Sequence, residues 1–114
     1  MKNTSSRHFV VTGGNGYIGS HLCRLLFEHG HRVSIIDNYS TSPKTPTHGF
    51  GDFFMGEIDD CVLWKNITQV QSVDAVFHFA AKALVGESES NPWLYYQANV
   101  IKTINLLQLM KFHH

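Results

Sequence analysis

VTGGNGYIGS occupies residues 11–20 and places four glycines within seven positions. Glycine loses more backbone freedom on folding than any other residue, so a cluster of this kind needs a structural or functional reason. The run HFVVT at 8–12 precedes the glycines, and a helical apolar pattern begins after them. A strand, a tight turn and a helix in this order predict an anion-binding site, because the free N–H groups and the dipole of the helix point back at the turn.

Each glycine of this G-x-x-G-x-x-G spacing has an expected role. Gly13 allows the tight turn, Gly16 lets the backbone approach a pyrophosphate, and Gly19 lets the helix pack close to the strand. No lysine follows in the spacing of a P-loop, which disfavours that class of nucleotide-binding protein.

Asp37 provides the second part of the expected nucleotide site. It ends the apolar run RVSIID at 32–37, where its carboxylate can accept both hydroxyls of an adenosine ribose. Residues 38–42, NYSTS, hold no Arg or Lys for a 2′-phosphate, which favours NAD over NADP. The alternative is a glycine-rich turn that binds nothing, with Asp37 as a solvated strand end.

The remaining segments predict an α/β fold of the Rossmann type. Strands are expected at 8–12, 32–37, 53–58 and 74–81, and helices from Ile18 to Gly30, over 59–70, and from Pro92 to about Met110. Their alternation predicts a parallel sheet with helices on both faces, truncated to about four strands in the order 3-2-1-4. We expect residues 1–114 to form a single, partial NAD-binding domain without a substrate domain.

Two apolar stripes are expected on the helices of this fold. The first stripe comprises Ile18, Leu22, Leu25 and Leu26. The second stripe, on the last helix, comprises Tyr96, Val100, Thr103, Ile104 and Leu107. Helical stripes of this kind normally pack on a sheet.

Composition excludes several other classes of protein. Lys and Arg balance Asp and Glu at nine each, so no electrostatic reason exists for a nucleic-acid or membrane partner. Cys23 and Cys61 lack metal-binding spacing, and the histidines are scattered, so no metal site is expected. The polar start MKNTSSRH and two free thiols favour a cytoplasmic protein.

Four segments together resemble the extended short-chain dehydrogenase/reductase family, from about residue 8 to residue 110. They are VTGGNGYIGSHL, VSIIDNYSTS, VFHFAAKALVGES and NPWLYYQANVIKTINLL. The resemblance is closest to the N-terminal, NAD-binding part of the family members that epimerise UDP-glucose and UDP-galactose at C4. It implies NAD as cofactor and a place in galactose metabolism.

The resemblance also implies roles for individual residues. Those expected at the pyrophosphate are Gly13, Gly16, Tyr17 and Ile18. The adenosine ribose would lie against Asp37 and Asn38, with Ser42 nearby, and the adenine against Glu57 and Ile58. The nicotinamide side would be lined by Phe79, Ala80 and Ala81, for which a place in the core at a strand end is a compatible alternative.

Two positions depart from the family pattern. Glu57 stands where the family usually has Asp, which lengthens or shifts the contact with adenine. Lys102 in NVIKT replaces the glycine of the family's NVxGT, so we expect looser packing of that helix and a less certain role for Asn99.

The chain contains no residue to which the family's catalytic role can be assigned. The family reaction oxidises C4 of the sugar to a ketone and returns the hydride to the opposite face, using a Y-x-x-x-K pair as base. None of the four tyrosines has lysine four positions later. Three hypotheses remain open: an inactive cofactor-binding fragment, a stand-alone dinucleotide-binding or sensing module, and half of an enzyme completed by a second chain.

The expected strand order makes a further prediction about assembly. The strand within 75–81 would lie at the edge of the sheet with apolar side chains and unpaired backbone groups. We expect this edge to make the chain a homo-oligomer or dependent on a partner, unless the helix from Pro92 folds back over it.

Overall fold

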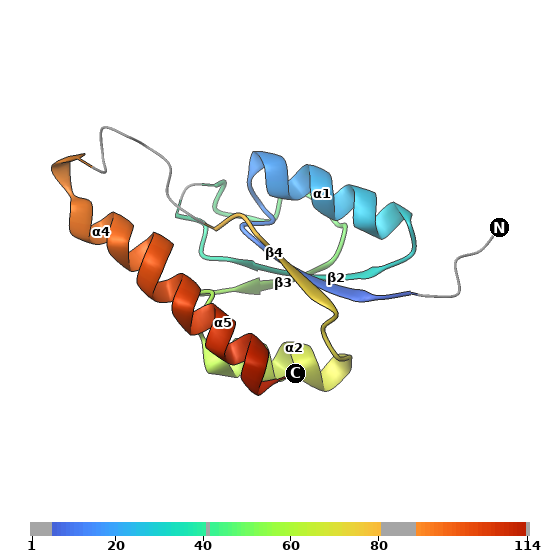
Figure 1. Ribbon diagram of the computed structural model, residues 1–114. Helices are drawn as coiled ribbons and strands as arrows, with labels where there is room; N and C mark the ends of the chain where they lie inside the picture. Colours follow the sequence, from blue (N-terminus) through green and yellow to red (C-terminus); the bar gives the residue numbers. More distant parts are fainter. Residues whose placement is uncertain (1–5, 41, 81–88, 114) are drawn as a thin grey trace.

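The computed structural model describes residues 6–40, 42–80 and 89–113. Four parallel strands form one sheet in the order β3-β2-β1-β4 (Figure 1). The strands are β1 (His8–Thr12), β2 (Arg32–Asp37), β3 (Asp52–Met55) and β4 (Ala75–His78). The predicted Rossmann-type fold and strand order are therefore confirmed.

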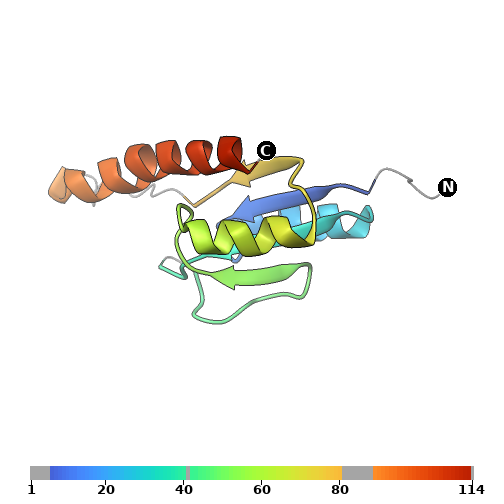
Figure 2. The same ribbon diagram turned by 90° about the horizontal axis from the view of Figure 1, so that it is seen from below.

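The helices cover both faces of this sheet (Figures 1 and 2). The helices are α1 (Tyr17–Glu28), α2 (Cys61–Val70), α4 (Pro92–Tyr96), the π-helix η1 (Gln97–Ile101) and α5 (Lys102–Phe112). α1 packs on one face, whereas α2 and α5 lie on the other. α4 extends beyond the carboxyl ends of the strands, so the helical run from residue 92 starts near that edge and returns along the sheet.

The two faces have separate apolar cores. The core under α2 and α5 comprises Val10, Ile36, Ile58, Trp64, Ile67 and Leu106. The core under α1 comprises Val11, Cys23, Val33 and Ile35. Alternate residues of β1 and β2 supply both cores, because successive side chains on a strand point to opposite faces.

Both predicted apolar stripes are only partly correct. On α1, Gly19 and Cys23 are buried, while Ile18 and Leu25 are exposed. On the last helix, Leu106 is buried, while the predicted positions Tyr96, Val100, Ile104 and Leu107 are exposed. Thr103 turns instead toward the sheet, where it hydrogen-bonds to His78. Ile104 and Leu107 belong to regular α5, so their exposure reflects how that helix is rotated against the sheet.

Strands β3 and β4 are shorter than predicted. Residues 56–58 leave β3 and turn toward the carboxyl edge of the sheet. β4 ends at His78. The N–H of Phe79 donates to the Thr12 carbonyl oxygen at 2.9 Å and also lies 3.0 Å from Thr12 Oγ1, which accepts the N–H of Ala80 at 3.2 Å. Both strand ends therefore curve into the crevice outside the sheet, where ligands of open α/β folds bind.

Candidate functional site

Two of the three motif glycines are required by the packing of the protein itself. Gly13 has φ +71°, and a Cβ there would lie 2.9 Å from the backbone of Phe79. A Cβ at Gly19 would collide with the carbonyl oxygen of Gly13. The expected roles of these two residues in the turn and in close helix packing are consistent with this geometry.

Gly16 differs from them, because protein atoms leave room for a side chain. A Cβ at Gly16 would meet only the Gly13 carbonyl oxygen, at 3.4 Å. Its φ of −83° is also open to any residue. The space beside it belongs to a cavity of about 350 Å³ at the carboxyl edge of the sheet. This is the arrangement expected where a ligand, and not the protein, excludes the Cβ.

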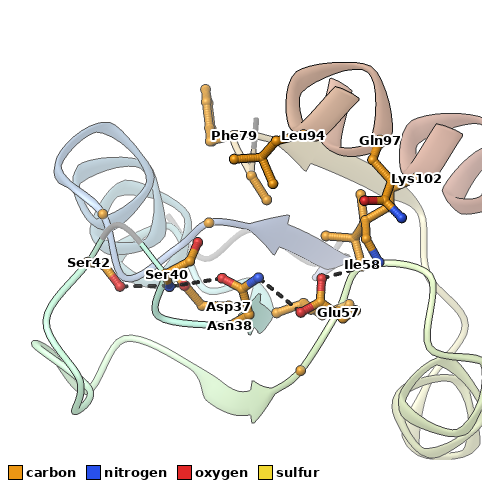
Figure 3. A pocket seen from close by; sticks show the side chains of 15 residues that line it. Asp37, Asn38, Ser40, Ser42, Glu57, Ile58, Phe79, Leu94, Gln97 and Lys102 are labelled. Atoms are coloured by element: carbon orange, nitrogen blue, oxygen red, sulfur yellow. Dashed lines mark hydrogen bonds and ion pairs between the residues drawn. The ribbon is translucent and has the colours of Figure 1, made fainter. Parts of the chain in front are cut away.

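The cavity collects most of the residues expected at the cofactor (Figure 3). Those that line it are Gly13, Gly16, Asp37, Asn38, Ser42, Glu57, Ile58, Phe79 and Ala80. Tyr17 and Ile18 do not line it, and these residues are 82% and 64% exposed. Ala81 lies outside the described residues.

Asp37 is buried at the end of β2 and already accepts several hydrogen bonds. The N–H of Asn15 donates to Oδ2 at 3.0 Å, and the N–H of Tyr39 donates to Oδ1 at 2.7 Å. The hydroxyl of Ser42 lies 3.4 Å from Oδ1. An ionised carboxylate has about four acceptor positions, so capacity remains for a ligand hydroxyl. The fixed donors hold the carboxylate in one orientation at the cavity.

A network of charges begins at two residues of the cavity lining, Glu57 and Lys102. Lys102 lies 3.4 Å from Glu57 Oε1 and 3.2 Å from Asp59 Oδ1, and Asn105 donates to Asp59 Oδ2 at 3.0 Å. Burial opposes ionisation at Asp59, but the bonds from Asn105 and Lys102 outweigh it and lower the pKa of Asp59. Burial likewise opposes the charge on Lys102, but Asp59 and Glu57 raise the pKa of Lys102. Lys102 and Asp59 are therefore both charged near neutral pH.

The sequence pattern of the NAD dependent epimerase/dehydratase family matches residues 9–114. The chain belongs to this family. It is 44% identical over 106 residues to a UDP-glucose 4-epimerase of Halalkalibacterium halodurans, covering 91% of this chain and 31% of that protein. It is 39% identical over 104 residues to the Corynebacterium glutamicum enzyme of the same name, covering 91% of this chain and 31% of that protein.

Solved structures of UDP-glucose 4-epimerases superpose on this epimerase/dehydratase family member. The Brucella ovis enzyme in complex with NAD gives a TM-score of 0.85 at 37% identity, covering 95% of this chain and 33% of that one. The Bifidobacterium longum enzyme in complex with NAD⁺ and UDP gives a TM-score of 0.82 at 32% identity, covering 93% of this chain and 34% of that one. The chain thus spans about a third of the length of the relatives named here.

Sequence reasoning missed three further residues that line the cavity from the last helical run of this epimerase/dehydratase family member. They are Leu94, Gln97 and Lys102. Asn99 lines a different depression, with Pro92, Tyr95, Tyr96 and Val100. No pattern in the sequence marks the π-helix η1, which gives Gln97 and Lys102 directions that they would not have in a continuous α-helix.

Asn15 is another residue that sequence reasoning missed, at a variable position of the glycine motif. It is 2% exposed, and its amide joins the turn to the loop after β2. Nδ2 donates to the carbonyl oxygens of Pro43 and Thr45 at 2.9 and 3.0 Å, and Oδ1 accepts from Thr47 N–H at 2.8 Å. Its partners lie about 30 residues away in the sequence, so no local pattern could reveal the role.

Cations and metal ligands are sparse around this site. Within the loop after β2, Lys44 donates to the Tyr39 carbonyl oxygen at 3.0 Å and does not line the cavity. Among residues 6–40, 42–80 and 89–113, no cluster of three His, Cys, Asp or Glu side chains could hold a metal ion.

Over the same residues, no helix is long and apolar enough to cross a membrane. Cys23 and Cys61 are free thiols, and burial raises the pKa of Cys23 to about 12.

Proposed function

We propose that this chain binds NAD in the cavity and serves as the cofactor-binding part of a UDP-glucose 4-epimerase-like protein. The observation that carries the proposal is Gly16: protein atoms leave room for a Cβ there, and Gly16 lines a cavity that the Asp37 carboxylate also lines. The family and its NAD-bound relatives support the choice of ligand. A single NAD-binding unit over 1–114, located in the cytoplasm, is part of this proposal.

The proposed roles follow the cavity from one wall to the other. The glycine turn and the N–H groups that begin α1 hold the pyrophosphate, with Tyr17 and Ile18 contributing backbone. Asp37 and Asn38, with Ser42, bind the adenosine ribose, and Glu57 and Ile58 lie at the adenine. Phe79, Ala80 and Ala81 flank the nicotinamide, which supplies a hydride acceptor when the cofactor is bound.

Calorimetry with NAD and NADP tests the cofactor assignment. We expect NAD to bind more tightly, because a 2′-phosphate would meet the Asp37 carboxylate, and the described lining residues that follow it, Asn38, Ser40 and Ser42, carry no positive charge. Asp37→Ala should weaken NAD binding about tenfold and narrow the difference between the two cofactors. Loss of the carboxylate leaves the N–H groups of Asn15 and Tyr39 without their acceptor, so the free energy of unfolding of the variant is measured together with its affinity for NAD. Equal or tighter binding of NADP to the unmodified chain would refute the ribose assignment.

We also propose that the chain alone does not epimerise UDP-glucose or UDP-galactose. It has no tyrosine with lysine four positions later, so it lacks the pair that generates a phenolate base. The assay uses the purified chain with added NAD, prepared from a host without its own epimerase. Turnover above background would show that another residue acts as the base.

Completion by a second chain is a second candidate function, and two surface features support it. β4 pairs only with β1, so its outer edge has no partner strand among the residues that the structure describes. Trp93, Tyr96, Val100, Ile104 and Leu107 also expose apolar surface on the last helical run. A partner chain, or a second copy, would cover such surface. A pull-down that recovers a chain with a Y-x-x-x-K pair would support this alternative.

A further inference from the structure

Lys102 reaches the cavity because of the π-helix that precedes it. Its backbone N–H donates to the carbonyl oxygen of Gln97, five residues earlier. In an α-helix two positions five residues apart are separated by about 140°, so they would face different directions. The i→i+5 bonding brings Gln97 and Lys102 to the same side, where both line the cavity (Figure 3).

Lys102 and Asn38 together fix the carboxylate of Glu57. Lys102 Nζ lies 3.4 Å from Oε1, and Asn38 Nδ2 donates to Oε2 at 3.0 Å. Lys102 is held in turn by Asp59 at 3.2 Å and is the only cationic residue among the described residues that line the cavity. Both carboxylate oxygens of Glu57 are therefore bound from opposite sides of the site.

The backbone beneath Glu57 is also fixed. The N–H of Gly56 donates to the Asp37 carbonyl oxygen at 3.1 Å, and the indole of buried Trp64 donates to the Ile58 carbonyl oxygen at 2.9 Å. With the main chain held, the position of the Glu57 side chain depends on its two partners. An ionised carboxylate with both oxygens bound once still has acceptor capacity for a ligand.

We propose that Lys102 is a positioning residue of the dinucleotide site, which with Asn38 holds the Glu57 carboxylate where it accepts the exocyclic amino group of adenine. This rests on the proposed NAD function, in which Asp37 takes the adenosine ribose and Glu57 lies at the base. A carboxylate accepts but does not donate, so it matches the amino group of adenine and not the carbonyl oxygen of hypoxanthine. Lys102 thus contributes to selection of the base.

The experiment compares NAD with nicotinamide hypoxanthine dinucleotide, in which a carbonyl oxygen replaces that amino group. Calorimetry gives the affinity ratio of the two ligands for the unmodified chain and for Lys102→Met. We expect Lys102→Met to weaken NAD binding about tenfold, and binding of the hypoxanthine analogue less than about twofold, since one bond to a charged group is lost. Lys102→Arg keeps the charge and should retain most of the ratio.

Matched variants separate positioning from stability. Lys65→Met removes a lysine from the exposed face of α2 and should leave the ratio unchanged. Glu57→Gln should lower the preference for NAD over the hypoxanthine analogue. Adding Lys102→Met to Glu57→Gln should lower this preference little further, because both substitutions act through the same carboxylate. Lys102→Gln replaces Lys102→Met if that variant does not fold.

The outcomes distinguish this inference from the function on which it rests. Failure of the unmodified chain to bind NAD refutes the proposed function. Binding of NAD with an unchanged ratio in Lys102→Met refutes the positioning role alone. Equal weakening of both ligands shows a purely structural role, and tighter NAD binding by Lys102→Met shows that the ion pair obstructs the base; either result overturns the inference.

Discussion

Gly16 and Gly19 lie three residues apart, yet their hydrogen atoms face different surroundings. A Cβ at Gly19 would collide with the Gly13 carbonyl oxygen, whereas a Cβ at Gly16 would have room, and Gly16 lines the cavity. Substitution of each residue should therefore separate folding from binding.

Gly16→Ser should weaken NAD binding about tenfold or more while leaving the free energy of unfolding nearly unchanged. Serine accepts the backbone angles of Gly16 and is a good N-cap for α1, so folding tolerates it. Its side chain fills the space proposed for the pyrophosphate. Calorimetry measures binding, and urea denaturation measures stability.

Gly19→Ala is the matched control and should behave in the opposite way. Its methyl group collides with the Gly13 carbonyl oxygen, so we expect a loss of about 1–3 kcal/mol in the free energy of unfolding. Unchanged NAD affinity in Gly16→Ser would contradict the assignment of the open side of Gly16 to the ligand.

At the scale of elements, His78 joins β4 to β1 and α5. Thr12 Oγ1 accepts two backbone N–H groups, so its own hydroxyl donates to His78 Nδ1 at 2.6 Å. His78 Nε2–H then donates to Thr103 Oγ1 at 3.1 Å. Burial lowers the pKa of His78 from its ordinary value of 6.5. A second ring proton would also displace the bond from Thr12, so the neutral ring fits this network.

The chain should lose stability as the pH falls below about 6.5. His78 binds a proton more readily in the unfolded state than in the folded state. The stability that neutral His78 contributes is therefore present above pH 6.5 and is lost as the pH falls through the pKa of the folded state. His78→Gln should reduce the slope of stability against pH and cost about 1 kcal/mol at pH 8.

Urea denaturation between pH 8 and pH 5 measures this slope. His21→Gln, on the exposed face of α1, controls for the removal of an imidazole. A slope in His78→Gln equal to that of the unmodified chain would show that other groups cause the acid sensitivity.

At the scale of the whole molecule, the outer edge of β4 is available for association. α5 packs on the face that it shares with α2, with Leu106 in the core, and no described strand lies beside the outer edge of β4. The ring of Phe77 packs on Phe9, 5.7 Å between centroids, and is half-buried. We expect the chain to form dimers or larger species through this edge.

Sedimentation over a concentration series tests this prediction. Phe77→Lys should shift the population toward monomer, with circular dichroism confirming that the variant still folds. Leu107→Lys, on the exposed face of α5, should not. If Leu107→Lys alone dissociates the species, the helix face is the interface. A monomer at all concentrations would contradict association altogether.

The sequence alone determined the strand–turn–helix motif, the alternation of elements, the strand order and the place of Asp37 at the end of β2. These features depend on local spacing: strands have period two, helices period 3.6, and the glycines mark one turn. The parallel sheet then follows from general rules of connection, which bring Gly16 and Asp37 to the same edge. The family resemblance rested on the same motifs.

Tertiary structure decided which helix faces are buried and how the far wall of the cavity is built. The π-helix turns Lys102 into the cavity. Its ion-pair partner Asp59 is 43 residues away in the sequence, and Asn15 binds Thr47 across 32 residues. Such contacts require the packed sheet, because only folding brings these side chains within hydrogen-bond distance. A sequence period fixes which side chains share a face of a regular helix, but the rotation of that helix against the sheet is set by packing.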